Sequence, residues 1–200
     1  EYMDIVSFTK EIYMSFYEYA LKHSVNYKFE HMEEKLNLWF DPVQLQKVIF
    51  NLLSNAFKYT KAKGSITVSI RKIKNEVEIR VEDDGVGISK ESIHKIFDRF
   101  YQVDGQSSEF TLGTGIGLAV SKGIVELHKG NIRVESEVGQ GSVFIVTLLT
   151  GNEHFPKEVL SDSESNFHLI KDGVLEDLAL EELMLEEPVK EQELTNEEKA

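Results

Sequence analysis

The stretch from Asp41 to Thr60 constrains the fold more than any other part of the chain; it reads D-P-V-Q-L-Q-K-V-I-F-N-L-L-S-N-A-F-K-Y-T. Asp41 can cap a helix, Pro42 suits its first turn, and Gln44 stands where a capping box places a side chain that reaches back. Apolar residues then recur at helical spacing and form one broad stripe: Leu45, Val48, Ile49, Leu52, Leu53 and Ala56. We therefore expect a helix with one face in a core.

Three polar residues of the same stretch fall on a line beside the apolar stripe. At roughly 100° per residue, Asn51, Asn55 and Lys58 lie along one flank of the predicted helix. A helix that only filled a core would have no use for two amides and an ammonium there. We interpret them as ligands for a polyanion, such as a nucleotide with its metal. The alternative is an ordinary solvated face, and this helix alone does not decide between the two.

Size and charge bound the class of protein. With 200 residues, 41% of them hydrophobic, the chain suits one domain plus an extension, or two very small domains. Cysteine is absent, which excludes a disulfide framework and a thiolate metal site. No apolar run is long enough to span a membrane, and Glu1-Tyr2-Met3-Asp4 lacks the character of a signal peptide, as expected for a segment within a longer protein.

The acidity of the chain is concentrated at its end. Residues 151–200 carry a net charge of −11, whereas residues 1–150 carry −2. No concentrated basic face is present, so we expect no contact with nucleic acid.

Periodicity predicts an alternation of helices and strands. We expect three further helices, over 5–22, 89–97 and 117–127. Ser7 is the expected cap of the first, and the last is expected to end around His128. Strands are predicted over 27–32, 36–40, 65–70, 77–82, 132–136 and 142–148, with a hairpin turn at Asn75. Residues 98–112 have no steady period, and a loop of this length is usually functional or mobile. Residues 172–187 suit either a short helix or a flexible acidic linker.

Two glycine-rich turns stand where chemistry is expected. In Asp83-Asp84-Gly85-Val86-Gly87, a carboxylate at a strand end could accept a hydrogen bond from an exocyclic amine such as that of adenine; an ordinary Asp-Gly turn is the alternative. Residues 113–117 precede a helix whose first N–H groups would favour phosphate. The turn is not a P-loop, and Leu118 breaks the Rossmann pattern. A Rossmann site stays an alternative because Glu135 lies about where a ribose-binding acid would fall.

Four segments then follow one another in a specific order: N-L-L-S-N-A-F-K-Y-T, V-E-D-D-G-V-G-I, I-F-D-R-F-Y-Q-V-D and G-T-G-I-G-L-A-V-S-K. Together they resemble the ATP-binding catalytic domain of sensor histidine kinases, within the wider group of DNA gyrase, mismatch-repair and chaperone ATPases. The resemblance covers about residues 5–149. It implies an α+β fold, a two-layer sandwich with a mixed, mostly antiparallel sheet covered on one face by helices, and a mobile ATP lid. Residues 1–150 would form this domain and residues 151–200 an acidic linker leading to a further domain.

The resemblance also implies roles for individual residues. Asn55 would bind Mg²⁺ bridging the phosphates of ATP, and Lys58 would contact phosphate. Asn51 stands where hydrolysing relatives carry a glutamate base, which fits transfer to a histidine. Asp83 would take the adenine amine, assisted through water by Ser142. The other residues expected to line the nucleotide or its lid are Tyr59, Gly85, Gly87, Ile88, Arg99, Tyr101, Gly113, Thr114, Gly115, Ile116, Gly117 and Leu118.

The same resemblance implies partners that this chain does not contain. None of its six histidines has the sequence context of a phosphoacceptor, so a separate helical hairpin domain of the same protein would supply dimerisation and the acceptor histidine. As in hybrid sensor kinases, a receiver domain would follow downstream, and the whole would be the cytoplasmic part of a membrane-anchored sensor. Many family members carry an arginine where Gln102 stands, which leaves a degenerate nucleotide-sensing or scaffolding module as the alternative. Stand-alone ATP hydrolysis is disfavoured by Asn51.

Overall fold

The computed structural model describes residues 1–102 and 115–161. Its body is a five-stranded sheet in the order β2 (Asn26–His31), β4 (Ser65–Ile73), β5 (Glu76–Asp83), β7 (Gly141–Leu149) and β6 (Asn131–Glu137). β2 runs parallel to β4, and the other neighbours are antiparallel. The short strands β1 (Tyr2–Asp4) and β3 (Asn37–Trp39) form a separate antiparallel pair. The mixed, mostly antiparallel sheet predicted from the sequence is confirmed, as is the β4–β5 hairpin.

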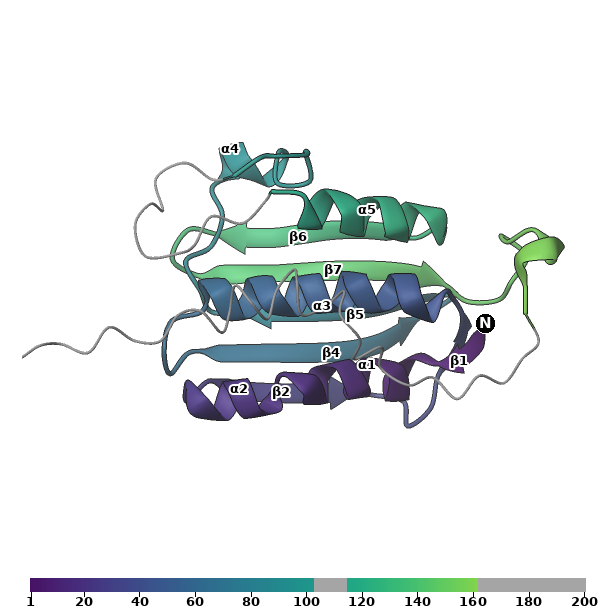
Figure 1. The fold of residues 1–200 in the computed structure, drawn as a ribbon, viewed down its shortest axis with the longest axis horizontal. Coiled ribbons are helices and arrows are strands. Elements are labelled where there is room, and N and C mark those ends of the chain that lie inside the picture. The colour runs from purple at the N-terminus through teal and green to yellow at the C-terminus, as the bar shows by residue number, and fades with distance from the viewer. Residues whose placement is uncertain (103–114, 162–200) are drawn as a thin grey trace, which may run out of the picture.

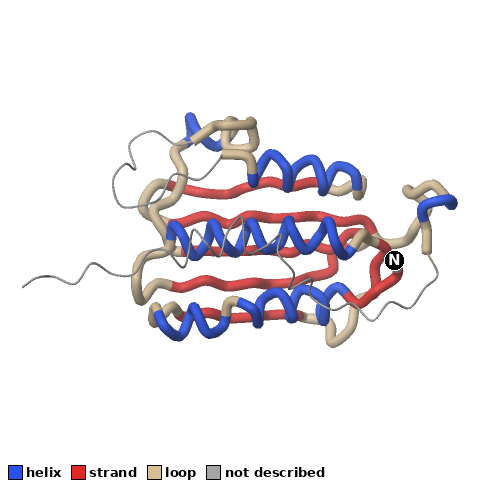
Figure 2. The backbone as a smooth tube through the Cα atoms, viewed as in Figure 1, coloured by secondary structure: helices blue, strands red, loops and turns tan. Residues whose placement is uncertain are grey.

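The long helices lie on one face of the sheet. α1 (Ile5–Ser15) and α2 (Tyr17–Lys22) cover the β2 edge, α3 (Pro42–Tyr59) runs along the middle of the sheet, and α5 (Gly117–Leu127) lies beside β6 (Figure 1). The backbone tube, viewed from the same side, shows these helices in front of the strands (Figure 2). A short helix, α4 (Lys90–Ile93), and a 3₁₀ turn, η1 (Lys157–Val159), lie outside this pair of layers. The expected two-layer α/β arrangement is therefore confirmed.

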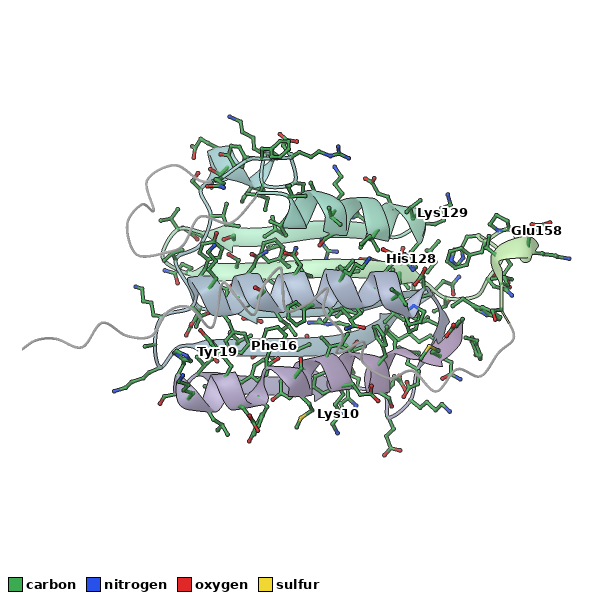
Figure 3. The ribbon with its side chains drawn as sticks, in the orientation of Figure 1. Lys10, Phe16, Tyr19, His128, Lys129 and Glu158 are labelled. Carbon is green, nitrogen blue, oxygen red and sulfur yellow. The ribbon has the colours of Figure 1, made fainter. Side chains whose placement is uncertain are left out.

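The core lies between α3 and the sheet. All six residues of the predicted apolar stripe are buried, from Leu45 to Ala56, and they meet the inward residues of the strands. Rings from the first helices complete the core: Phe16 lies 4.8 Å from the Phe50 ring and 5.4 Å from the Phe57 ring between centroids, and Tyr19 meets Phe57 edge-on (Figure 3). Because α3 is held along its whole length, the polar residues on its flank are fixed relative to the sheet.

The predicted first helix does start at Ile5, but the prediction is wrong in its cap and its continuity. Asp4, not Ser7, is the cap, because its carboxylate accepts the N–H groups of Val6 and Ser7. The helix also breaks at Phe16, between α1 and α2. Ser15 donates its hydroxyl proton to the carbonyl of Ile12 at 2.6 Å, a side-chain bond that competes with the helical ladder and bends it.

Two other local expectations need correction. Asp41 does cap α3, accepting the N–H of Gln44 at 3.0 Å, but the Gln44 side chain does not complete the capping box. Instead its Oε1 accepts a bond from Lys47 at 3.4 Å. The helix predicted over 89–97 is confined to α4, because the chain then continues through three-residue turns, as in the bond from the Lys95 N–H to the Ser92 carbonyl.

A buried histidine joins the far ends of two helices. His128, 6% exposed, ends α5, and its Nδ1 donates to the carbonyl of Ile124 at 2.8 Å. Its Nε2 accepts the backbone N–H of Asp41, the cap of α3, at 3.0 Å. Figure 3 shows His128 at the end of α5 that faces the segment carrying Glu158. Both ring nitrogens thus have a hydrogen-bond partner, and His128 has a structural role.

We expect His128→Leu to destabilise the domain by about 1–3 kcal/mol, since it leaves the partly buried Asp41 N–H, the cap of α3, without its acceptor. Chemical unfolding monitored by circular dichroism measures this. His94→Leu is the matched control, because His94 is exposed and should change stability little. Equal unfolding midpoints for the two variants would show that the bridge carries no stability.

Candidate functional site

One end of the candidate site is built around a buried carboxylate. Asp83 is the last residue of β5 and is 6% exposed, and its Oδ1 accepts the N–H of Gly85 at 2.9 Å. Burial raises the pKa of Asp83 to about 6, with the neighbouring charges of Asp84 and Glu82 adding to the shift. The Gly85 and Ser142 N–H groups act in the opposite direction. A buried acid whose pKa is raised in this way is typical of a binding or catalytic site.

Two serines on adjacent strands lie beside this carboxylate. Ser142 of β7 pairs directly with Asp83 and is equally buried. Ser136 of β6 pairs in turn with Ser142, and their Oγ atoms are 3.0 Å apart. A hollow of about 330 Å³ opens here, with Asp83 and both serines among its lining residues. The sequence reasoning included Ser142 but missed Ser136, although the alternation of β6 places it on the same face as Ser142.

The glycine turn after Asp83 requires glycine for close backbone approach. A Cβ at Gly85 would lie 2.3 Å from the carbonyl oxygen of Tyr59, at the end of α3. Gly87 has φ +70°, and a Cβ there would lie 2.0 Å from the carbonyl oxygen of Glu137. The turn is thus wedged between α3 and the β6–β7 turn. Ile88, which follows, packs partly buried against the core.

The polar flank of α3 leads from this turn to the start of α5. Asn51, Asn55 and Lys58 are all half-buried, and Tyr59 is 36% exposed. The Asn51 amide donates to the hydroxyl of the buried Ser121 in α5 at 3.0 Å. A rise of ~1.5 Å per residue puts Asn51 roughly 12 Å from Tyr59 along the helix axis. That is about the span from the base of a nucleoside triphosphate to its phosphates.

The other end of the site is the first turn of α5. Gly117 begins the helix next to Asn51, because a Cβ at Gly117 would lie 2.3 Å from the Asn51 Oδ1. Ile116 caps the helix without a side-chain hydrogen bond in the described part of the chain, and Leu118 packs against the core. First-turn N–H groups that no side chain caps make such a helix start favourable for an anion.

The segments on either side of residues 103–114 are joined to each other. The Phe100 N–H donates to the Gly115 carbonyl at 2.8 Å, and both residues have positive φ, +65° and +66°. A Cβ at Gly115 would lie 2.9 Å from the Phe100 carbonyl carbon, so this approach needs glycine. The Tyr101 hydroxyl donates to Ser92 at 3.0 Å, which ties the same segment to α4.

Not every predicted residue joins this arrangement. Arg99 and Gln102 are exposed, and no described contact brings Arg99 to the α3 flank. Gly113 and Thr114, with most of the predicted 98–112 loop, lie outside the described residues. So do residues 172–187, for which either a short helix or a flexible linker is expected. Glu135 faces away from the helices and pairs with Arg133 at 3.6 Å and Arg80 at 3.9 Å. Its position and the antiparallel sheet show that the Rossmann alternative is wrong.

Comparison with known proteins agrees with this geometry. Residues 40–152 match the family model described as histidine kinase-, DNA gyrase B- and HSP90-like ATPase. The chain belongs to this family. Histidine kinase P4 from Formosa agariphila is 42% identical over 163 residues, which are 80% of this chain and 12% of that protein. The sensor protein kinase WalK from Staphylococcus aureus is 39% identical over 127 residues, 62% of this chain and 29% of that protein.

A solved structure places the chain more narrowly within the ATPase family. The nucleotide-free catalytic domain of histidine kinase ThkA superposes with a TM-score of 0.66 at 27% identity, covering 75% of this chain and 98% of that domain. ThkA has also been solved in complex with the response regulator protein TrrA. The chain is therefore an ATP-binding catalytic domain of the histidine kinase type, and it spans a minor part of its curated relatives' length. In residues 1–102 and 115–161, no helix is long and apolar enough to cross a membrane.

Proposed function

We propose that this domain binds ATP with Mg²⁺ along the flank of α3 and donates the γ-phosphoryl group to a histidine on a separate helical hairpin domain. The observation that carries the proposal is the placement of both ends of the site on one helix. The Asp83 turn lies against Tyr59 at the end of α3, and the start of α5 lies against Asn51, about two turns before Lys58. A buried acceptor for an amine and an uncapped helix start, joined by amides and a lysine, suit a purine triphosphate.

The donor set fits a magnesium ion carried by the phosphates. Among the described residues there is no group of three or more histidines, cysteines or acids that could hold a metal by itself. Asn55 offers a half-buried amide oxygen, a hard ligand of the kind that Mg²⁺ accepts while keeping several waters. Bound there, the ion would neutralise phosphate charge. Asn55 would hold it, and Lys58 would orient the phosphates beside it.

Asn51 supports transfer rather than hydrolysis. Its amide, which already donates to Ser121, cannot abstract a proton from water. The domain therefore positions ATP without placing a general base at Asn51 to activate water. The nucleophile that attacks the γ-phosphate comes from the acceptor domain. We further propose that the whole protein is a cytoplasmic sensor-kinase assembly, with a receiver domain beyond the acidic residues 151–200, in keeping with the response regulator bound by ThkA.

Incubation with γ-labelled ATP, Mg²⁺ and an added hairpin domain tests the proposal. We expect the label to appear on the hairpin's histidine and not on this chain. Nucleotide binding without transfer at every magnesium concentration would instead favour the scaffolding alternative. That alternative is based on Gln102, an exposed residue that stands where many family members carry an arginine. Steady phosphate release without an acceptor would contradict the role given to Asn51.

Asn55→Ala should weaken the binding of Mg·ATP more than that of metal-free ATP, because only the metal complex uses the amide. The expected extra loss is about tenfold, the size of one hydrogen bond or ligand contact near a charge. Titration calorimetry with magnesium and with a chelator measures the two affinities. Ser54→Ala, at the preceding position of α3, is the control. An equal loss of affinity with magnesium and with the chelator would show that Asn55 does not bind the metal.

A further inference from the structure

We propose that Ser136 is a positioning residue that sets the hydrogen-bond polarity of the base end of the site, so that the pocket prefers a purine with an amine at C6, such as adenine, to one with a carbonyl group at C6, such as guanine. The inference rests on the proposed nucleotide function and deepens it. It assigns a role to a residue of β6 that lies one strand away from Asp83 and that the sequence motifs do not include.

The Ser136 hydroxyl makes three contacts at once. The backbone N–H of Ile88 donates to its Oγ at 2.8 Å. The Oγ lies 2.7 Å from the carbonyl oxygen of Gly141 and 3.0 Å from the Oγ of Ser142. Ser136 thus connects the turn after Asp83, the β6–β7 turn and the neighbouring strand through one oxygen atom.

Counting protons assigns a direction to each of these bonds. A serine hydroxyl has one proton and two lone pairs. The Gly141 carbonyl can only accept, so it takes the Ser136 proton, while the Ile88 N–H fills one lone pair of the Ser136 oxygen. The remaining lone pair faces Ser142, and that contact is a hydrogen bond only if Ser142 is the donor. Ser136 therefore consumes the single proton of Ser142.

The consequence appears at Asp83. Ser142 and Asp83 are directly paired across β7 and β5, so their side chains lie on the same face of the sheet. With its proton committed to Ser136, Ser142 presents only acceptor lone pairs beside a carboxylate, which is also an acceptor when ionised. Two adjacent acceptors match an amine such as that of adenine. The carbonyl oxygen of guanine would face them without a donor.

The polarity also depends on the β6–β7 turn. Gly141 has φ +91°, and a Cβ there would lie 1.9 Å from the Asp83 carbonyl oxygen. This close approach holds the Gly141 carbonyl within reach of Ser136. The Gly139 N–H donates to the Val86 carbonyl at 2.8 Å, which ties the same turn to the glycine turn after Asp83. The Ser136 network is thus fixed by backbone on both sides rather than by mobile side chains.

Titration calorimetry tests the inference by measuring the affinities for ADP and GDP of the unaltered protein and of variants at Ser136 and Ser142. Ser136→Ala frees the Ser142 proton, and we expect the preference for ADP over GDP to fall about tenfold, the effect of one neutral hydrogen bond gained by the wrong base. Ser136→Thr keeps the hydroxyl and should keep the preference. Ser136→Ala combined with Ser142→Ala has no proton to release and should not gain affinity for GDP. Ser69→Ala, on the opposite face of β4, is the control for a distant serine.

Outcomes separate this inference from the proposed function. If Ser136→Ala weakens ADP and GDP equally, Ser136 only supports the backbone and the inference is wrong. Should Ser136→Ala fail to fold, Ser142→Ala alone decides: it must weaken ADP more than GDP, and a larger loss for GDP would show that Ser142 donates to the ligand. Failure of the unaltered protein to bind either nucleotide would overturn the proposed function itself.

Discussion

Asp83→Asn is expected to weaken ADP and ATP binding by about 100-fold, the effect of losing a hydrogen bond to a charged acceptor. The carboxylate accepts from the Gly85 N–H and stands where an amine of the ligand would complete its bonding. An asparagine amide can turn its NH₂ group toward the ligand amine and oppose it. Calorimetry at pH 7.5 measures the loss, and unchanged affinity would remove Asp83 from the site.

The same substitution is expected to stabilise the empty protein. Burial raises the pKa of Asp83 in the folded state from the ordinary aspartate value of 3.8 to about 6, so the folded state binds the proton more tightly than the unfolded state. Stability contributed by the protonated group is present at low pH and is lost as pH rises through about 6. Asparagine does not titrate. The stability gained by Asp83→Asn should therefore be small near pH 4 and reach a plateau of about 3 kcal/mol above pH 6.

Thermal or chemical unfolding of the two proteins across that pH range, without nucleotide, tests this sign. Asp84→Asn is the matched control, because Asp84 is exposed and carries a similar charge one residue away. A variant that is less stable than the parent at pH 8 would show that the buried carboxylate is stabilising. A gain in stability together with a loss of binding would mark Asp83 as a residue kept for its ligand.

Gly87→Ala is expected to damage the base end of the site most severely. Its φ of +70° strains any residue with a Cβ, and the added Cβ would meet the Glu137 carbonyl oxygen at 2.0 Å. Backbone atoms on both sides must move apart, which displaces Ile88 and its bond to Ser136. We expect adenine nucleotide binding to fall by about 100-fold or more and stability to fall by roughly 2–4 kcal/mol.

Alanine substitutions at two other glycines of the domain separate the effect of backbone strain from that of the contact with Glu137. Gly139 has a similar φ of +79° but nothing within 4 Å of an added Cβ, so Gly139→Ala reports backbone strain alone, about 1–2 kcal/mol. Gly123 lies within α5 with nothing within 4 Å, and Gly123→Ala should stabilise the helix by up to about 1 kcal/mol. If Gly87→Ala behaves like Gly139→Ala in both stability and binding, the contact with Glu137 is not what demands glycine.

Long periodic segments were predictable because burial requires them. The stripe from Leu45 to Ala56 and the alternation in β4 and β5 each put apolar side chains on one face, and no other arrangement would bury them. The polar flank of α3 and the Asp-Gly turn could be recognised by contrast with that pattern. The family resemblance predicts that they form one site, and the fold agrees with the family that it names.

Features set by single contacts were not predictable. Ser7 and Asp4 are both good caps, and the choice of Asp4 depends on where β1 pairs with β3, a contact between distant segments. The break at Phe16 follows from one hydroxyl of Ser15 turning back to Ile12. Ser136 sits in an ordinary alternating strand, and its three bonds exist only once β6, β7 and the glycine turn come together.

A crystal structure of this domain with a non-hydrolysable ATP analogue and Mg²⁺ tests the central claim most directly. The account predicts the adenine amine within hydrogen-bonding distance of the Asp83 carboxylate, and the phosphates between Asn55, Lys58 and the first turn of α5, with the metal on the Asn55 amide oxygen. A nucleotide bound elsewhere, or a base whose amine points away from Asp83, would contradict it.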